Sequence, residues 1–365
     1  MIAIRRLPRL SWTVLTPLLG VAVLALAWGR DLGPVLVVLV AVVLAGTVLS
    51  AVHHAEIVAL RVGEPFGSLV LAVAVTVIEV AMIVTLMISG GPEAASLARD
   101  TVFAAVMITT NGIVGLSLLL GALRHGFTLF NSEGSGAALA TVATLATLCL
   151  VLPAFTTSEP GPEFSAPQLT FAALASLALY GMFVLTQTVR HRDFFLPVSS
   201  EGVVEAEEHA PTPSGRAAVA SVGFLLLALV AVVGLAKVES PAVEAGVREA
   251  GFPQSFVGVV IALLVLLPET LAAGRAAVRE RIQISLNLGY GSAMASIGLT
   301  IPTIALASIW LEGPLVLGLG STQMILLALT VVVSVLTVVP GRATRLQGGV
   351  HLILFAAFVF LAINP

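Results

Sequence analysis

Runs of about 20 consecutive apolar residues recur along the whole chain and leave few folds open to it. The sequence is 58% hydrophobic and only 10% charged, whereas soluble domains carry about 25% charged residues. One soluble core cannot bury this much apolar surface, so we predict an all-α integral membrane protein. About eleven candidate transmembrane spans are separated by segments rich in proline and glycine, at residues 12–28, 34–52, 68–89, 100–121, 137–155, 168–189, 217–236, 255–273, 284–308, 321–339 and 347–363.

The basic residues fall mainly on one side of these spans. With a cytoplasmic N-terminus and alternating spans, 13 of the 17 lysines and arginines lie inside and four lie outside. Because cytoplasmic loops are enriched in Lys and Arg, we expect a multi-pass protein with its N-terminus in the cytoplasm and its C-terminus outside. The four outer basic residues are Arg30, Arg99, Lys237 and Arg248.

A long polar interruption divides the chain near its middle. Apart from the first span, five spans precede it and five follow it. Each span of the second set crosses the membrane in the opposite direction to its counterpart in the first set, which predicts two inverted repeats. We therefore expect an accessory transmembrane helix at 1–30, five-helix repeats at 31–190 and 216–365, and a cytoplasmic linker at 191–215. The linker holds a short acidic run. This run is a candidate regulatory segment, although a solvated linker is the simpler explanation; its members are Glu201, Glu205, Glu207 and Glu208.

Two spans each carry a single glutamate in an otherwise apolar stretch. Glu79 lies in SLVLAVAVTVIEVAMIVTLMISG (68–90) and Glu269 lies in SFVGVVIALLVLLPETLAAG (255–274). A charged side chain at the bilayer centre costs at least about 2.5–3.5 kcal/mol. A matching pair in two inverted halves therefore indicates a binding site near the membrane midplane.

Such carboxyl groups can exchange protons for cations. Removal from water favours the neutral acid, whereas a nearby cation favours the carboxylate. A site that holds either protons or a metal ion is what an exchanger needs, and two carboxylates balance the charge of one divalent cation.

Small polar residues follow each glutamate on the next predicted helix and could supply neutral oxygen ligands. Aligning Arg99 with Arg281 places Thr110 opposite Ser292. Calcium takes about 6–8 oxygen ligands, so this inventory suits a hard cation as substrate, with no cofactor. The candidate binding residues are Glu79, Glu269, Thr110, Asn111, Gly291, Ser292 and Ser296, with the two glutamates as the metal ligands.

A weaker candidate group lies at the predicted end of the second span. His53 and His54, with Glu56 and Glu64, could provide ion access or pH sensing at the cytoplasmic face, although a loop without chemistry explains them more simply. The sequence has no phosphate loop, no GxSxG elbow and no metal-finger spacing. We therefore expect neither an enzyme nor a nucleic-acid partner. The expected surrounding is the lipid bilayer, and the sequence is compatible with a homo-oligomer.

Two long segments resemble the calcium/cation antiporter superfamily, and most closely its bacterial calcium/proton antiporters of the ChaA type. They are GEPFGSLVLAVAVTVIEVAMI and LLPETLAAGRAAVRERIQISLNLGYGSAMASIGLTIP. The resemblance implies ten core helices in two inverted halves, usually with an extra first helix, in the bacterial plasma membrane. It implies that Glu79 and Glu269 are the essential acids and that Gly291 and Ser292 form the following Gly-Ser signature.

The predicted function is exchange of cytosolic calcium for protons, with Glu79 and Glu269 alternating between the two substrates. A sodium or potassium/proton antiporter of the same fold is the main alternative. A cation channel is a second alternative, because a channel would use similar oxygen ligands without counter-transport. A membrane-embedded protease is disfavoured, since the acids lack histidine pairs or an aspartate dyad.

Overall fold

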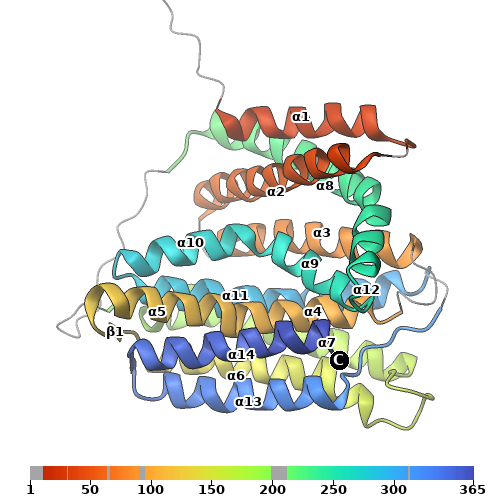
Figure 1. Ribbon diagram of the computed structural model, residues 1–365. Helices are drawn as coiled ribbons and strands as arrows, with labels where there is room; N and C mark the ends of the chain where they lie inside the picture. Colours follow the sequence, from red (N-terminus) through yellow and green to blue (C-terminus); the bar gives the residue numbers. More distant parts are fainter. Residues whose placement is uncertain (1–10, 31, 64–65, 90–94, 199–211, 311–312) are drawn as a thin grey trace, which may run out of the picture.

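The computed structural model describes residues 11–30, 32–63, 66–89, 95–198, 212–310 and 313–365. Within them the chain is almost entirely helical, which confirms the predicted all-α class (Figure 1). The first half contains α1 (Trp12–Ala27), α2 (Pro34–Val62), α3 (Phe66–Ser89), α4 (Leu97–Met107), η2 (Ile108–Ile113), α5 (Val114–His125), β1 (Thr128–Leu129), α6 (Ser132–Ala146), η3 (Thr147–Val151), η4 (Leu152–Ala154), α7 (Ala166–Leu185), η5 (Thr186–Arg190) and η6 (Arg192–Phe195). The second half contains α8 (Gly215–Glu249), α9 (Phe256–Val265), α10 (Leu267–Val278), α11 (Ile282–Gly298), α12 (Thr300–Ala307), α13 (Ser321–Val338), β2 (Arg342–Ala343) and α14 (Arg345–Ile363).

The lengths of the helices agree with a multi-pass membrane protein. Among the described residues, nine helices are long and apolar enough to cross a bilayer, and α9 with α10 makes a tenth candidate that is bent by 55°. The apolar α1 has only 16 residues, fewer than the about 20 that a span usually needs. The expected count of eleven spans is therefore close to the ten candidates found in the described part of the chain, and the short α1 accounts for the difference.

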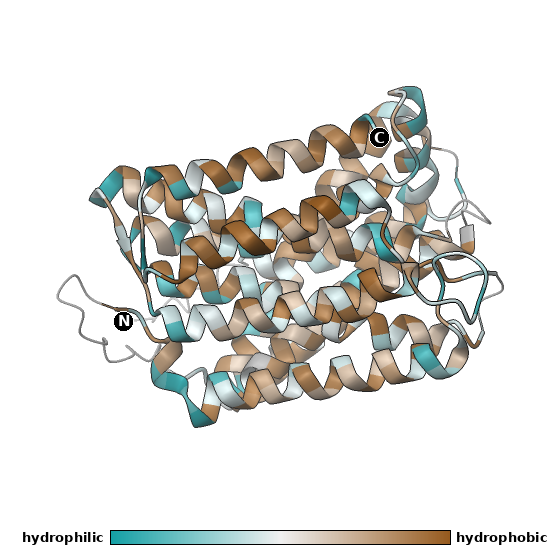
Figure 2. Ribbon diagram, turned by 90° about the horizontal axis from the view of Figure 1, so that it is seen from below, coloured by the Kyte–Doolittle hydropathy of each residue, from teal (hydrophilic) through white to brown (hydrophobic). Residues whose placement is uncertain are grey.

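The helices lie side by side between two ends of the molecule (Figure 1). At one end, here called the β end, β1 pairs antiparallel with β2. At the opposite end, here called the C-terminal end, an isolated bridge joins Glu163 to Val316, and the chain finishes at Pro365. Hydrophobic residues line the middle of the helices and polar residues gather mainly toward the two ends (Figure 2).

The outer surface is apolar, as expected where lipid replaces water. Val35, Val219 and Ile353 are exposed by 75%, 74% and 70%, respectively. In a soluble protein an apolar surface of this extent would drive association. Here it forms the face that the bilayer covers.

Corresponding helices of the two halves make corresponding contacts. α2 packs along α8, with α1 against both of them, while α3 contacts α11 and α12, and α9 and α10 contact α4 and α5. Likewise α7 packs on α11 and α12, and α14 packs on η2 and α5. These contacts place α3, which carries Glu79, and α10, which carries Glu269, at the centre of the molecule.

Several elements differ from the predicted spans. α2 continues to Val62 rather than ending near residue 52, and α8 continues to Glu249 through Pro241. These extensions carry charged and small residues that lower the local hydropathy without ending the helix.

The close crossing of α5 and α14 depends on a glycine. A Cβ added to Gly115 in α5 would lie 2.8 Å from the Cβ of His351 in α14.

Candidate functional site: two buried carboxyl groups in one cavity

Glu269 stands at a break in its transmembrane segment. α9 ends at Val265, and α10 begins at Leu267 with a bend of 55°. Pro268 suits the start of α10 because its missing N–H has no partner to lose there. Glu269 thus lies in the first turn of α10, where the positive end of the helix dipole favours a carboxylate.

Glu79 reaches the same region from the middle of α3. Its side chain is only 2% exposed. The hydroxyl of Ser296 in α11 donates to Glu79 Oε2 at 3.0 Å, and the hydroxyl of Thr300 donates to the same oxygen at 3.2 Å. Thr300 begins α12, directly after α11 ends at Gly298. The second half of the chain therefore orients the carboxyl group of the first half.

Both carboxyl groups line one cavity of about 160 Å³ between α3, α7, α10 and α11. Its lining residues extend from the two acids toward the β end. Polar groups from all four helical segments contribute to the wall. The complete lining is Leu71, Ala72, Val75, Thr76, Glu79, Tyr180, Phe183, Val184, Gln187, Leu266, Glu269, Asn287, Leu288, Gly291, Ser292, Ala295 and Ser296.

Each acid keeps one buried oxygen without a hydrogen-bond partner among the described residues. These atoms are Oε1 of Glu79 and Oε2 of Glu269. Buried polar atoms in native proteins are nearly always satisfied, so an unpaired one indicates a missing ion, proton or water. Both of these oxygens belong to side chains that line the same cavity.

A second cavity, of about 260 Å³, approaches from the C-terminal end between α4, α9, α13 and α14. Asp100 contributes to its wall and accepts hydrogen bonds from Ser96 and Arg99, each at 2.8 Å. Deeper along α4 and α14, the rings of Phe103 and Phe358 meet edge to face with centroids 5.6 Å apart. Both rings are buried, and both belong to the wall of this cavity.

Comparison with known proteins identifies the family. The model of the sodium/calcium exchanger protein family matches residues 32–189 and 220–364. The chain belongs to this family. The resemblance to cation antiporters that the sequence suggested is thereby confirmed.

Similar proteins match nearly the full length of the chain. The protein y4hA of Sinorhizobium fredii, which carries the name of an ionic transporter, is 45% identical over 97% of this chain and 96% of its own. The sodium-potassium/proton antiporter ChaA of Escherichia coli is 33% identical over 95% of this chain and 94% of its own. The crystal structure of the H+/Ca2+ exchanger CAX superposes with a TM-score of 0.70 at 16% identity, covering 95% and 86% of the two chains.

Five of the predicted exchanger residues lie together at the cavity. They are Glu79, Glu269, Gly291, Ser292 and Ser296. A Cβ added to Gly291 would meet no atom within 4 Å, so this glycine leaves room beside the acids.

Thr110 and Asn111 lie elsewhere, so the expectation that they join the two acids is not met in this conformation. Thr110 donates its hydroxyl to the carbonyl of Val106 within the same helix. Asn111 Nδ2 donates to Thr330 Oγ1 at 2.9 Å, and Asn111 Oδ1 lies 3.0 Å from His351 Nδ1. The π-helical turn of η2 directs these residues toward α13 and α14, away from the cavity.

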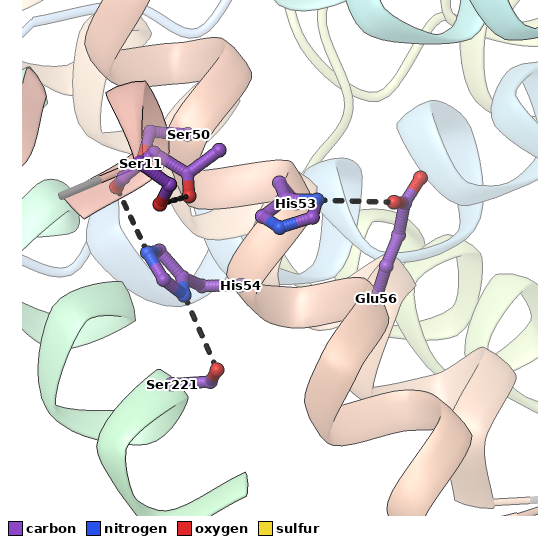
Figure 3. Close-up of polar contacts among 7 residues, drawn as sticks. Ser11, Ser50, His53, His54, Glu56 and Ser221 are labelled. Carbon is purple, nitrogen blue, oxygen red and sulfur yellow. Dashed lines mark hydrogen bonds and ion pairs between the residues drawn. The ribbon is translucent and has the colours of Figure 1, made fainter. Parts of the chain in front are cut away.

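The predicted loop around His53 and His54 is helical, because α2 continues past it. The carbonyl of Thr13 can only accept, so His54 Nε2 donates to it at 2.9 Å, and Nδ1 accepts from Ser221 at 3.2 Å (Figure 3). His54 thus joins α2 to α1 and α8. Its neighbour His53 points toward Glu56 at 4.0 Å (Figure 3).

None of these α2 residues lines the cavity of the two acids. Glu64 and the linker residues Glu201, Glu205, Glu207 and Glu208 lie outside the described residues. Their suggested roles in ion access and regulation stay predictions.

Further polar residues at the site lie outside the candidate binding set. Thr300 binds Glu79, while Gln187 and Asn287 line the cavity. Thr300 and Asn287 lie on the predicted span 284–308 with Ser292 and Ser296, and this run of small polar residues was the signal that pointed to them. Gln187 lies near the end of the predicted span 168–189, where no comparable pattern distinguishes it.

Proposed function

We propose that the protein is a secondary active transporter that exchanges cytosolic calcium for protons. The observation that supports this most directly is the meeting of Glu79 and Glu269, one from each half, with one free oxygen each in a common cavity. Buried ionisable groups within transmembrane helices characterise ion pathways and proton relays.

The chemistry is competition for two carboxyl groups. When the cavity holds no cation, removal from water favours the protonated acids; an arriving cation favours their ionised forms. One divalent ion then replaces up to two protons with no change of net charge at the site. Further oxygens for a hard cation come from Ser292, Asn287 and Gln187, which line the same cavity.

The distribution of basic residues supports a cytoplasmic β end. Of the 14 lysines and arginines among the described residues, 10 lie near this end and four near the other. By the positive-inside rule the cavity with the two acids then opens toward the cytoplasm. We therefore assign the structure to the state that receives cytosolic cation, within the bacterial plasma membrane.

Two cavities at opposite ends fit alternating access. The cavity of about 160 Å³ is lined by both acids, and the cavity at the C-terminal end has the contact between Phe103 and Phe358 in its wall. We propose this aromatic contact as the closure of the outer route. Exchange would require the inner route to close before this aromatic contact opens, as inverted-repeat transporters do.

Transport of sodium or potassium is the second candidate. The 33% identity to a sodium-potassium/proton antiporter over nearly the full chain favours it. In that case one carboxylate would bind the monovalent ion while the other carries a proton.

Ion flux into proteoliposomes under an imposed pH gradient tests both candidates. We expect saturable calcium uptake coupled to proton movement, and competition by sodium or potassium if they share the site. Calcium movement that persists without any proton movement would support a channel instead. Full exchange by Glu79→Gln together with Glu269→Gln would remove the proposed site.

A further inference from the structure

The two acids differ in how the protein holds them. Glu79 accepts two hydroxyl hydrogen bonds through Oε2. No other described side chain donates to Glu269, and its Oε2 is buried and unpaired. The matching positions of the two halves therefore carry unequal carboxyl groups.

The sequence itself encodes this inequality. Aligning Arg99 with Arg281 places Val114 opposite Ser296 and Leu118 opposite Thr300. Val114 and Leu118 are both fully buried and apolar. The hydroxyl pair that serves Glu79 thus has no counterpart in the other half.

The backbone around the acids is unequal as well. Glu79 lies within a continuous helix of 24 residues. Glu269 follows the break at Leu266, where two short helices meet at 55°. A helix break can absorb changes of backbone angle, whereas a continuous helix fixes its side chains more firmly.

Resting on the proposed function, we propose that Ser296 and Thr300 are positioning residues that fix Glu79 as the anchored cation ligand. Glu269 is then the carboxyl group that reorients as protons and cation replace each other. With Oε2 of Glu79 held by two hydroxyls, Oε1 is oriented in advance, and the cation does not have to order that side chain on binding.

Removing the hydroxyls tests the assignment. Ser296→Ala and Thr300→Val should each raise the half-saturating cation concentration roughly tenfold, the worth of one hydrogen bond to a charged group. The maximal flux should stay within about twofold, because the remaining machinery is intact. Thr300→Ser keeps the hydroxyl and should restore the wild-type concentration dependence.

Thr303→Val is the matched control. Thr303 lies on the same helix, but its hydroxyl donates to the carbonyl of Leu299 and contacts neither acid. A purely structural role for the Thr300 hydroxyl would instead lower the maximal flux and the yield of folded protein, with the half-saturating concentration unchanged. That outcome would overturn the proposal.

Calorimetric binding of calcium by purified protein separates this inference from the proposed function. We expect Glu79→Gln to abolish binding, and Glu269→Gln to leave weak binding with a shallower pH dependence, because only the proton of Glu79 then competes with the cation. Equal losses in both variants, with no effect of the hydroxyl substitutions, would refute the unequal roles while leaving antiport intact. Wild-type cation binding without proton release would instead refute the antiport mechanism. If either glutamine variant fails to fold, the Thr300→Val and Thr300→Ser pair decides the question.

Discussion

His351 Nδ1 lies 3.0 Å from Oδ1 of Asn111, and this contact joins α14 to the π-helical turn of η2. Because an amide oxygen only accepts, Nδ1 carries the proton, and Nε2 accepts from Thr337 at 3.1 Å. His351 is fully buried. Its hydrogen bonds therefore hold three helical segments together without contact with water.

Replacing His351 should destabilise the fold. His351→Ala leaves buried polar groups of Asn111 and Thr337 unpaired, at a cost of about 1–3 kcal/mol for each unsatisfied group. The melting temperature of the detergent-purified protein should fall by several degrees. The exposed His191, which stacks on Phe194, offers the control His191→Ala, and equal melting temperatures for both variants would contradict this role.

Neutralising either central acid should stop exchange. Glu79→Gln or Glu269→Gln should reduce coupled flux roughly a hundredfold or more, since removing one partner of a buried charge interaction costs about 3–5 kcal/mol. Flux measured in proteoliposomes at matched protein content checks this. Glu133→Gln, an exposed residue in the first turn of α6, should leave the rate unchanged.

Filling the space beside the acids should block transport without unfolding the protein. Gly291 has no atom within 4 Å of an added Cβ, so Gly291→Val places its side chain in open space at the cavity. We expect flux to fall by about tenfold or more, with a normal melting temperature. Gly223→Val, equally open but outside the cavity, should transport normally, and normal flux by Gly291→Val would argue against this route.

Cation binding should strengthen as pH rises. At low pH both acids carry protons that the cation must displace, whereas at high pH fewer protons have to leave. By linkage, the apparent dissociation constant should fall by up to about two log units per pH unit where two protons are released. Binding titrations across pH measure this slope, and Glu269→Gln should lower it; a flat profile in the wild-type protein would contradict proton competition.

Opening the aromatic contact should uncouple the two substrates. Phe103→Ala removes the edge-to-face contact with Phe358, which we propose as the outer closure. We expect cation leak that continues without a pH gradient, measured by dye-loaded proteoliposomes. Phe171→Ala, on the exposed face of α7, serves as the control and should remain coupled.

The hydropathy pattern predicted the helical membrane fold well, because about 20 apolar residues per span is a demand of the bilayer itself. It also found Glu79 and Glu269, whose burial in an apolar run is costly. It misplaced His53 and His54 because α2 continues through charged residues to Val62. It could not place Asn111, whose direction depends on the π-helical turn, or Thr300, which reaches Glu79 only because α11 ends at Gly298.

The pairing of β1 with β2 has a mechanical consequence. With the bridge between Glu163 and Val316 at the opposite end, it fastens the segments that flank α6 to those that flank α13. Because α6 and α13 are joined in this way at both ends, they resist sliding along each other. α2 and α8 pack along each other away from both fastenings (Figure 1), so we expect sliding between the halves to occur there.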